Sequence, residues 1–127
     1  MLSAYFNSLE TLLTNFDFSS STIEKEIIDS EKGIFEAKLI FEDGFLDFLE
    51  VIQIENNNVF AKIKYRYNFM DKDKNLIFRY DNAAHHKNIK TFPHHKHTPN
   101  GVYESEEPNL LLVLREISEH LLKNENS

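Results

Sequence analysis

The chain has no cysteine and no tryptophan, and only three glycines and three prolines among its 127 residues. The absence of cysteine excludes disulfide bonds, thiolate metal sites and a cysteine nucleophile. With so few glycines there is little room for a glycine-rich phosphate-binding loop, and neither a Walker pattern nor a G-x-S-x-G pattern occurs. A reducing cytosol suits such a composition, and we expect a cytoplasmic protein.

Long hydrophobic runs are also missing. The first sixteen residues, MLSAYFNSLETLLTNF, lack a basic leading segment and carry Glu10 among their apolar residues. We therefore expect neither a signal peptide nor a membrane span, and no membrane partner. Apolar residues still make up 41% of the chain, with eleven phenylalanines, which is enough for a packed interior. At this length we expect a single domain over residues 1–127.

Hydrophobic periodicity predicts two helices with several strands between them. Apolar residues spaced three and four apart predict a helix over about residues 3–15 and another over about 108–122. Alternation of apolar and polar residues predicts five strands, over about residues 23–29, 35–41, 46–54, 59–69 and 76–80. Short polar connections, such as Asp43-Gly44, favour antiparallel neighbours. The expected fold is α+β, an antiparallel meander of about five strands with both helices packed on one face.

Charge is distributed unevenly along the chain. The net charge of −7 argues against a nonspecific nucleic-acid binder. Residues 59–98, however, hold nine basic and three acidic residues, a balance of +6, whereas the remainder carries −13. Five of the six histidines lie in this basic segment. The segregation either reflects solvated charges without a role or marks a surface for an anionic ligand.

The same alternation assigns faces in the last predicted hairpin. If Tyr65 and Tyr67 point to the core, the polar face carries Lys62, Lys64, Arg66, Arg79 and Asp81. Two registers satisfy this pattern, one with Arg66 opposite Arg79 and one with Arg66 opposite Asp81. Because like charges directly opposed are destabilising, either Asp81 or an anionic ligand must compensate Arg66. The candidate nucleic-acid-binding residues are Lys62, Lys64, Arg66, Lys87 and Lys96.

A histidine-rich segment follows the last predicted strand, and residues 79–97 read RYDNAAHHKNIKTFPHHKH. We expect residues 82–104 to form an ordered loop, since connections of this length in compact domains are usually functional. Phe92 and Pro93 would pin this loop to the sheet and return its second group of histidines toward its first. The two groups are His85 and His86, and His94, His95 and His97.

Three interpretations of these histidines stay open. In the first, imidazoles move protons during cofactor-free cleavage of RNA, while Arg79 stabilises the phosphate charge and Asp81 orients one ring. In the second, the histidines bind a divalent metal ion together with a carboxylate. In the third, they only hydrogen-bond the loop backbone. The candidate catalytic residues are Arg79, Asp81, His85, His86, His94, His95 and His97.

The basic segment also resembles a known family. The run YRYNFMDKDKNLIFRYDNAAHH, then FPHHKH, a short acidic stretch with proline and a leucine-rich helix are similar to the TumE-like family of type II toxin–antitoxin toxins. The most specific pieces are RYDNA-x-HH over residues 79–86 and FPHHKH over residues 92–97. Ala84 stands where that family is expected to have proline, and the glycine expected before Asn75 is missing. Both departures affect loop rigidity more than chemistry.

The resemblance implies a small growth-arresting toxin, encoded beside a helix-turn-helix antitoxin and acting on RNA, but it does not identify catalytic residues. The leading hypothesis is a cytoplasmic ribonuclease that binds RNA on the basic sheet face and cleaves it with loop histidines, Arg66 and Arg79 holding the phosphate. One alternative is a non-enzymatic module whose histidine loop binds a metal ion or a partner. Another is an antitoxin or immunity protein whose acidic remainder binds a basic partner. A homo-oligomer is compatible with each hypothesis.

Overall fold

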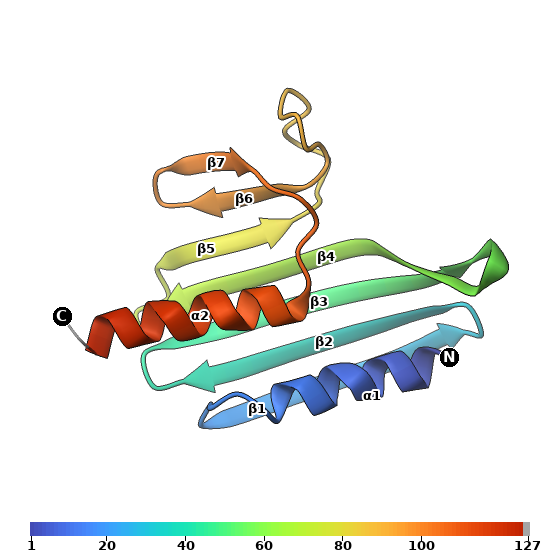
Figure 1. Cartoon of the computed structure of the whole chain (residues 1–127), viewed down its shortest axis with the longest axis horizontal. Coiled ribbons are helices and arrows are strands. Elements are labelled where there is room, and N and C mark those ends of the chain that lie inside the picture. The colour runs from blue at the N-terminus through green and yellow to red at the C-terminus, as the bar shows by residue number, and fades with distance from the viewer. Residues whose placement is uncertain (126–127) are drawn as a thin grey trace.

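The computed structural model describes residues 1–125 and contains two helices and one seven-stranded sheet (Figure 1). The helices are α1 (Leu2–Leu13) and α2 (Leu110–Glu125). The strands are β1 (Ser20–Asp29), β2 (Lys32–Phe41), β3 (Gly44–Glu55), β4 (Val59–Asp71), β5 (Leu76–Asp81), β6 (His95–Thr98) and β7 (Gly101–Glu104), with a 3-10 turn (Asn56–Asn58) before β4. Each strand pairs antiparallel with the next, so the α+β class and the antiparallel meander are confirmed.

The predicted number of about five strands is wrong, because β6 and β7 lie within the segment that was expected to be a loop. Each has four residues, and the sequence of β6, HKHT, shows no apolar alternation. Backbone pairing with β5 aligns β6, with Asp81 opposite His95. The turn between β6 and β7 consists of Pro99 and Asn100 and is followed by Gly101, and this run is a turn signal visible in the sequence. Gly101 has a φ of 143°, a conformation that favours glycine.

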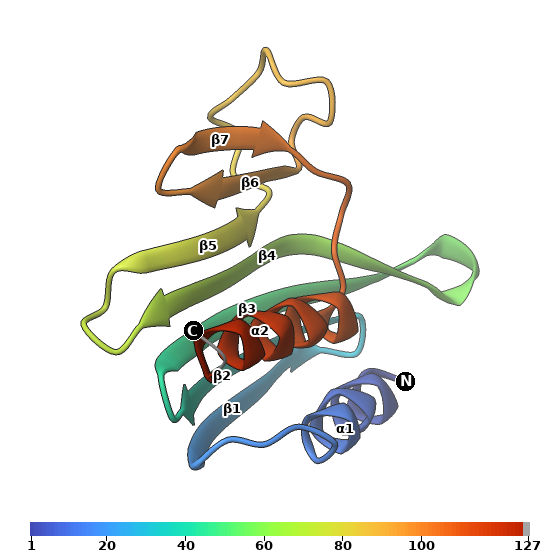
Figure 2. The ribbon, with the colours of Figure 1, turned by 60° about the vertical axis from the view of Figure 1, so that its left-hand side comes forward.

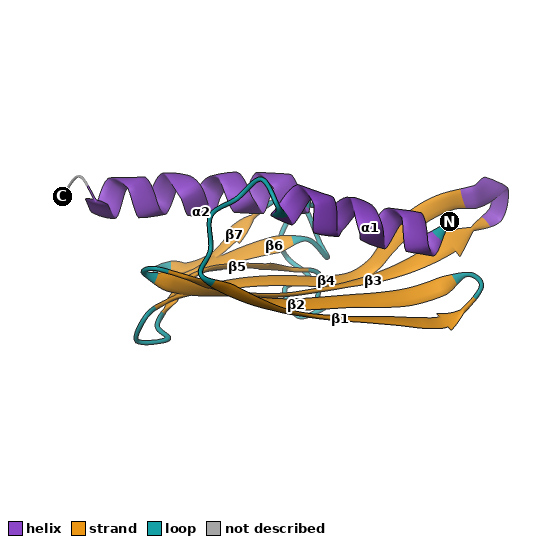
Figure 3. Cartoon of the chain, turned by 90° about the horizontal axis from the view of Figure 1, so that it is seen from below, coloured by secondary structure: helices purple, strands orange, loops and turns teal. Residues whose placement is uncertain are grey.

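Both helices lie on one face of the sheet, and the other face is bare (Figure 3). α1 runs along β1 and β2, and α2 lies across the middle strands (Figures 1 and 2). Phe6 of α1 and Leu114 of α2 are buried against inward residues of the sheet such as Phe48. Full burial of such a side chain contributes about 1.5–3 kcal/mol. The predicted packing of both helices on one face is confirmed, and no helix within residues 1–125 is long and apolar enough to cross a membrane.

A bulge in β4 changes the predicted faces. Successive residues of β3 pair with Lys64 and Lys62, so that Ile63 has no partner in the ladder. The extra residue returns Lys62 to the helix side, where its Nζ lies about 5 Å from the ring centroids of Tyr65 and Tyr67. The prediction that Lys62 shares a face with Lys64 is therefore wrong, because strict alternation does not continue through a bulge.

Candidate active site

Asp81, at the end of β5, is the centre of a polar cluster on the bare face. Its Oδ1 accepts the backbone N–H of Ala83 at 3.0 Å and lies 2.8 Å from His95 Nε2. Its Oδ2 lies 3.1 Å from Arg79 Nε and 3.4 Å from His97 Nε2. Asp81 is buried, and a buried carboxylate needs donors or positive charge around it. These four partners supply both.

The pairing of β5 with β6 explains why these groups meet. In this register Asp81 faces His95 and Arg79 faces His97. Side chains of a strand alternate between its two faces, so His95 and His97 share the bare face while Lys96 points toward the helices. Of the two registers predicted for β4 and β5, the structure has the one in which Arg66 faces Asp81.

His95 is held rigidly inside this cluster and is only 2% exposed. Its Nδ1 lies 2.9 Å from the carbonyl oxygen of Pro93, and its Nε2 faces Asp81. A carbonyl and a carboxylate only accept hydrogen bonds, so a ring protonated on both nitrogens satisfies both contacts. His95 is thus fixed between two acceptors and positions its neighbours rather than meeting solvent.

His86 joins His95 and His97 in a cluster of three rings, which we call the histidine triad. The ring centroids are 5.0 Å apart for His86 and His95, 5.6 Å for His86 and His97, and 4.7 Å for His95 and His97. One nitrogen of each ring lies within 4.8 Å of those of the other two. His86 and His97 are partly exposed, so they can contact a molecule on the bare face. Burial, with the charge of Arg79, lowers the pKa of His97, although Asp81 opposes the shift.

The structure separates the other two predicted histidines from the triad. His85 is exposed, and its ring makes no hydrogen bond or ring contact with any residue in the described part of the chain. The ring of His94 stacks on Tyr65 at 5.8 Å, and its Nδ1 lies 2.8 Å from the Tyr65 hydroxyl. Tyr65 belongs to the buried core beneath the helices. The two histidine groups therefore meet through His86, His95 and His97 alone.

Two polar residues that were not among the predicted site residues hold the loop in place. The side chain of Asn82 accepts the Tyr65 N–H at 3.0 Å and donates to the Ile63 carbonyl at 3.0 Å, so it fastens the chain beyond β5 to the β4 bulge. Thr91 Oγ1 donates to the His94 carbonyl at 2.7 Å and accepts the Ser105 N–H at 3.0 Å. The side chains of Asn and Thr readily bond backbone groups, and Asn82 also lies within the RYDNA-x-HH run, but neither signal indicates these distant partners.

The predicted anchors of the loop behave differently from each other. Phe92 is 40% exposed and lies outside the buried core, so its role as an anchor stays a prediction. Pro93 does act as an anchor, but through its backbone carbonyl, which lies against His95 Nδ1. Burial of His95 in the sheet thus fixes the end of the loop.

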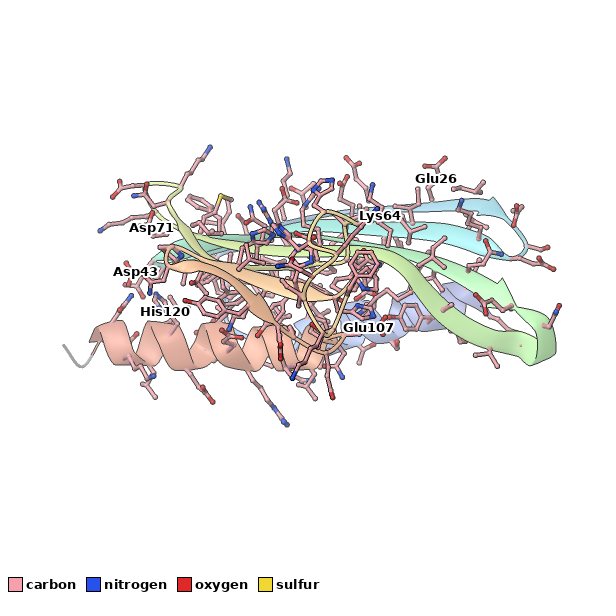
Figure 4. The ribbon with its side chains drawn as sticks, turned by 90° about the horizontal axis from the view of Figure 1, so that it is seen from above. Glu26, Asp43, Lys64, Asp71, Glu107 and His120 are labelled. Carbon is pink, nitrogen blue, oxygen red and sulfur yellow. The ribbon has the colours of Figure 1, made fainter. Side chains whose placement is uncertain are left out.

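Three basic residues of the bare face stand beside the triad. Lys64, Arg66 and Arg79 line, with Asp81, a groove of about 450 Å³. The Arg66 guanidinium lies 3.7 Å from Asp47 Oδ1, which is an ion pair too long for a hydrogen bond. Lys64 is exposed, makes no ion pair within residues 1–125, and points away from the helices (Figure 4). These charges are therefore available to an anion.

The remaining predicted binding lysines lie elsewhere. Lys96 Nζ donates to Glu116 Oε2 of α2 at 2.6 Å, and Lys62 Nζ donates to the Pro108 carbonyl at 2.6 Å. Burial lowers the pKa of Lys62 against the opposing charges of nearby acids. Both lysines fasten α2 and its approach to the sheet, and neither lies on the bare face. Lys87 is exposed on the loop and stays a candidate contact.

A second polar cluster lies on the helix side of the sheet, around Glu50. Glu50 is 1% exposed and accepts hydrogen bonds from the hydroxyls of Tyr5 and Tyr67, the latter at 2.6 Å. Lys62 Nζ also lies 2.6 Å from the Tyr67 hydroxyl. Burial and the Glu50 charge raise the pKa of both tyrosines, which keeps them protonated as donors. Glu50 interrupts an apolar alternation between Phe48 and Ile52, which is the signal that could have found it.

The chain matches the model of a known protein family. A family model described as Toxin TumE matches residues 8–121, which span the whole sheet, the loop, the second half of α1 and most of α2. No curated protein and no solved structure matches the chain.

Proposed function

The chain belongs to the TumE toxin family, and we propose that it is the toxin of a type II toxin–antitoxin system that cleaves RNA in the cytoplasm with its histidine triad. Membership of a toxin family implies an antitoxin partner. The observation that carries the proposal is the arrangement around Asp81, where one buried carboxylate holds Arg79, His95 and His97 beside a groove lined with positive charge. Such a site suits a phosphodiester.

The exposure of each side chain decides the role that we assign to it in the site. His86 and His97 are partly exposed, so we assign proton transfer to these two rings. His95 and Asp81 are buried and act as positioning residues, because they fix the orientation of His97 and its neighbours without contacting the substrate. Arg79 donates a hydrogen bond to Asp81 through its Nε, and its terminal nitrogens can therefore donate to a phosphate oxygen.

The chemistry needs two proton transfers and no cofactor. One imidazole takes the proton of a ribose 2′-hydroxyl, whose oxygen attacks the adjacent phosphorus. The bond from phosphorus to the 5′-oxygen breaks, and a second, protonated imidazole donates a proton to that leaving oxygen. The products are a 2′,3′-cyclic phosphate and a 5′-hydroxyl end. Arg66, Arg79 and Lys64 stabilise the negative charge that builds on the phosphate.

The basic groove contributes binding energy that carries no sequence information. Lys64 and Arg66 flank the groove on β4 and lie beside Arg79 on β5. Contacts of this kind act mainly with phosphates and weaken as salt increases. We infer that the bare face binds single-stranded RNA by its backbone, and that the adjoining loop with Lys87 extends this contact.

The proposal is tested with purified chain, an RNA substrate and a matched pair of histidine variants. His97→Ala should lower the cleavage rate about 100-fold or more, since it removes a proton-transfer group. His94→Ala should retain cleavage, because that ring faces the helix side. Thermal denaturation shows that both variants fold, and end-group mapping identifies the cyclic phosphate. Equal rates for the wild type and His97→Ala, or products with 5′-phosphate ends, would contradict the mechanism.

A further inference from the structure

We propose that the histidine triad, together with Asp81, is also a binding site for a divalent transition-metal ion such as Zn²⁺, and that the bound ion switches RNA cleavage off. The metal site stands on the geometry of the four side chains. The switch rests in addition on the proposed function, because it acts through the same ring nitrogens.

The spacing of the ring nitrogens fits a tetrahedral ion after a small movement. Zn–N bonds of about 2.0–2.1 Å place neighbouring ligand atoms roughly 3.3 Å apart. The triad nitrogens lie within 4.8 Å of one another, so the rings need to approach by at most about 1.5 Å. His86 lies on a loop and both it and His97 are partly exposed, so their rings can rotate by this amount without disturbing the core.

Asp81 already stands at ligand spacing from two of the rings. Its Oδ1 is 2.8 Å from His95 Nε2, and its Oδ2 is 3.4 Å from His97 Nε2. One distance is shorter and the other slightly longer than the separation of roughly 3.3 Å between two ligand atoms of a tetrahedral zinc ion. Three imidazoles and one carboxylate form a donor set that suits zinc and its neighbours, whereas Mg²⁺ prefers oxygen ligands throughout.

The contact behind His95 is the one that a metal ligand requires. A ligating histidine donates its other N–H to a carbonyl or carboxylate, which fixes the ring and its tautomer. His95 Nδ1 lies 2.9 Å from the Pro93 carbonyl, so its Nε2 is directed into the cluster. A bound ion would replace the proton that now lies between Nε2 and Asp81.

Arg79 works against the ion, and this gives the proposal a sharp test. Its guanidinium Nε lies 3.1 Å from Asp81 Oδ2, so its positive charge repels a dication at the triad. The variant Arg79→Gln should therefore bind Zn²⁺ more tightly than the wild type. The same substitution should weaken RNA binding, because a phosphate contact is lost.

Occupancy of the triad excludes proton transfer by the same groups. A ring nitrogen that binds a metal ion can neither accept the 2′-hydroxyl proton nor donate one to the leaving oxygen. The two uses of His86 and His97 therefore compete. Free zinc would hold the toxin inactive, and its removal would release it.

The experiment titrates the chelator-treated chain with Zn²⁺ alone in a calorimeter, with Mg²⁺ as the control cation. We expect one Zn²⁺ per chain and no Mg²⁺ binding. His86→Ala and His97→Ala should each lower the zinc affinity about tenfold or more. His85→Ala, the neighbouring histidine outside the triad, should leave it unchanged. Thermal melts without metal show that each variant folds, and cleavage assays with one equivalent of zinc, before and after chelation, test the switch.

Each outcome decides one part of the proposal. An absence of zinc binding, or equal affinities for His86→Ala, His97→Ala and His85→Ala, would overturn the metal site. Cleavage that requires zinc and stops with chelator would overturn the switch. A chain that binds zinc as expected but cleaves no RNA would overturn the proposed function and the switch with it, while the metal site would stand.

Discussion

The two faces of the sheet use the same kinds of residue in opposite ways. On the helix face, charged groups such as Lys62, Lys96 and Glu50 are all bound to partners inside the molecule. On the bare face, Lys64 and Arg66 are loosely held or unpaired within the described residues, and His86 and His97 are partly exposed. Alternation places such residues next to one another in the chain. The difference teaches that residue type alone does not show which charges are bound inside the molecule and which are open to a ligand; pairing and exposure do.

The largest effect is expected where burial and function coincide, at Asp81. Asp81→Asn removes the negative charge that holds His95, His97 and Arg79. The loss leaves the buried His95 ring and the Arg79 guanidinium without their charged acceptor, so the free energy of unfolding should fall by about 3 kcal/mol. Cleavage should fall about 100-fold or more, because the proton-transfer groups lose their orientation. Urea denaturation and a cleavage assay measure the two effects, and full activity in a folded Asp81→Asn variant would refute the central place of this carboxylate.

A second variant, Glu50→Ala, should destabilise the packing on the helix face without changing the site on the bare face. It leaves the hydroxyls of Tyr5 and Tyr67 without their buried acceptor and removes a negative charge near the half-buried Lys62 ammonium group. Each unsatisfied buried donor costs about 1–3 kcal/mol, so urea denaturation should show a loss of about 3 kcal/mol or more. At a temperature where the variant is folded, its cleavage rate should match that of the wild type. A stable variant without cleavage would show that the two faces are not independent.

The smallest effects come from a matched pair of lysines, Lys64→Ala and Lys96→Ala. Lys64→Ala should weaken RNA binding and make it less sensitive to salt, while the free energy of unfolding stays the same. Lys96→Ala breaks the partly exposed ion pair with Glu116, so the free energy of unfolding should fall by about 1 kcal/mol, with RNA binding unchanged. Filter binding across a salt series and urea denaturation separate them. Weaker RNA binding by Lys96→Ala, or a lower free energy of unfolding for Lys64→Ala, would contradict the roles given to the two faces.

Sequence patterns predicted most of the fold, because long runs of alternating residues form its central strands. The antiparallel meander and the two helices on one face follow from that periodicity and from the short polar turns. The strands β6 and β7 could not be predicted in this way, since backbone pairing with β5, not an apolar pattern, holds them in the sheet. The position of Lys62 could not be predicted either, because one unpaired residue in β4 moves the Lys62 side chain to the other face of the sheet.

The site was predictable only in part. Alternation placed Arg79 and Asp81 together on a polar face, and the basic balance of residues 59–98 pointed to an anionic ligand. The division of the histidines depends on pairing that spans the β5 and β6 ladder. That pairing sends His95 to the bare face, whereas His94 contacts Tyr65 on the helix side. Residue spacing alone cannot distinguish two adjacent histidines whose environments differ so much.

The most direct test of the central claim compares two adjacent histidines. Purified His86→Ala and His85→Ala variants should be assayed for cleavage of the same RNA, with folding checked by thermal denaturation. His86 lies in the triad, while His85 is exposed and contacts no other ring within residues 1–125. We predict that His86→Ala loses cleavage about 100-fold or more and that His85→Ala cleaves like the wild type. Equal cleavage by both folded variants would contradict the assignment of catalysis to the triad.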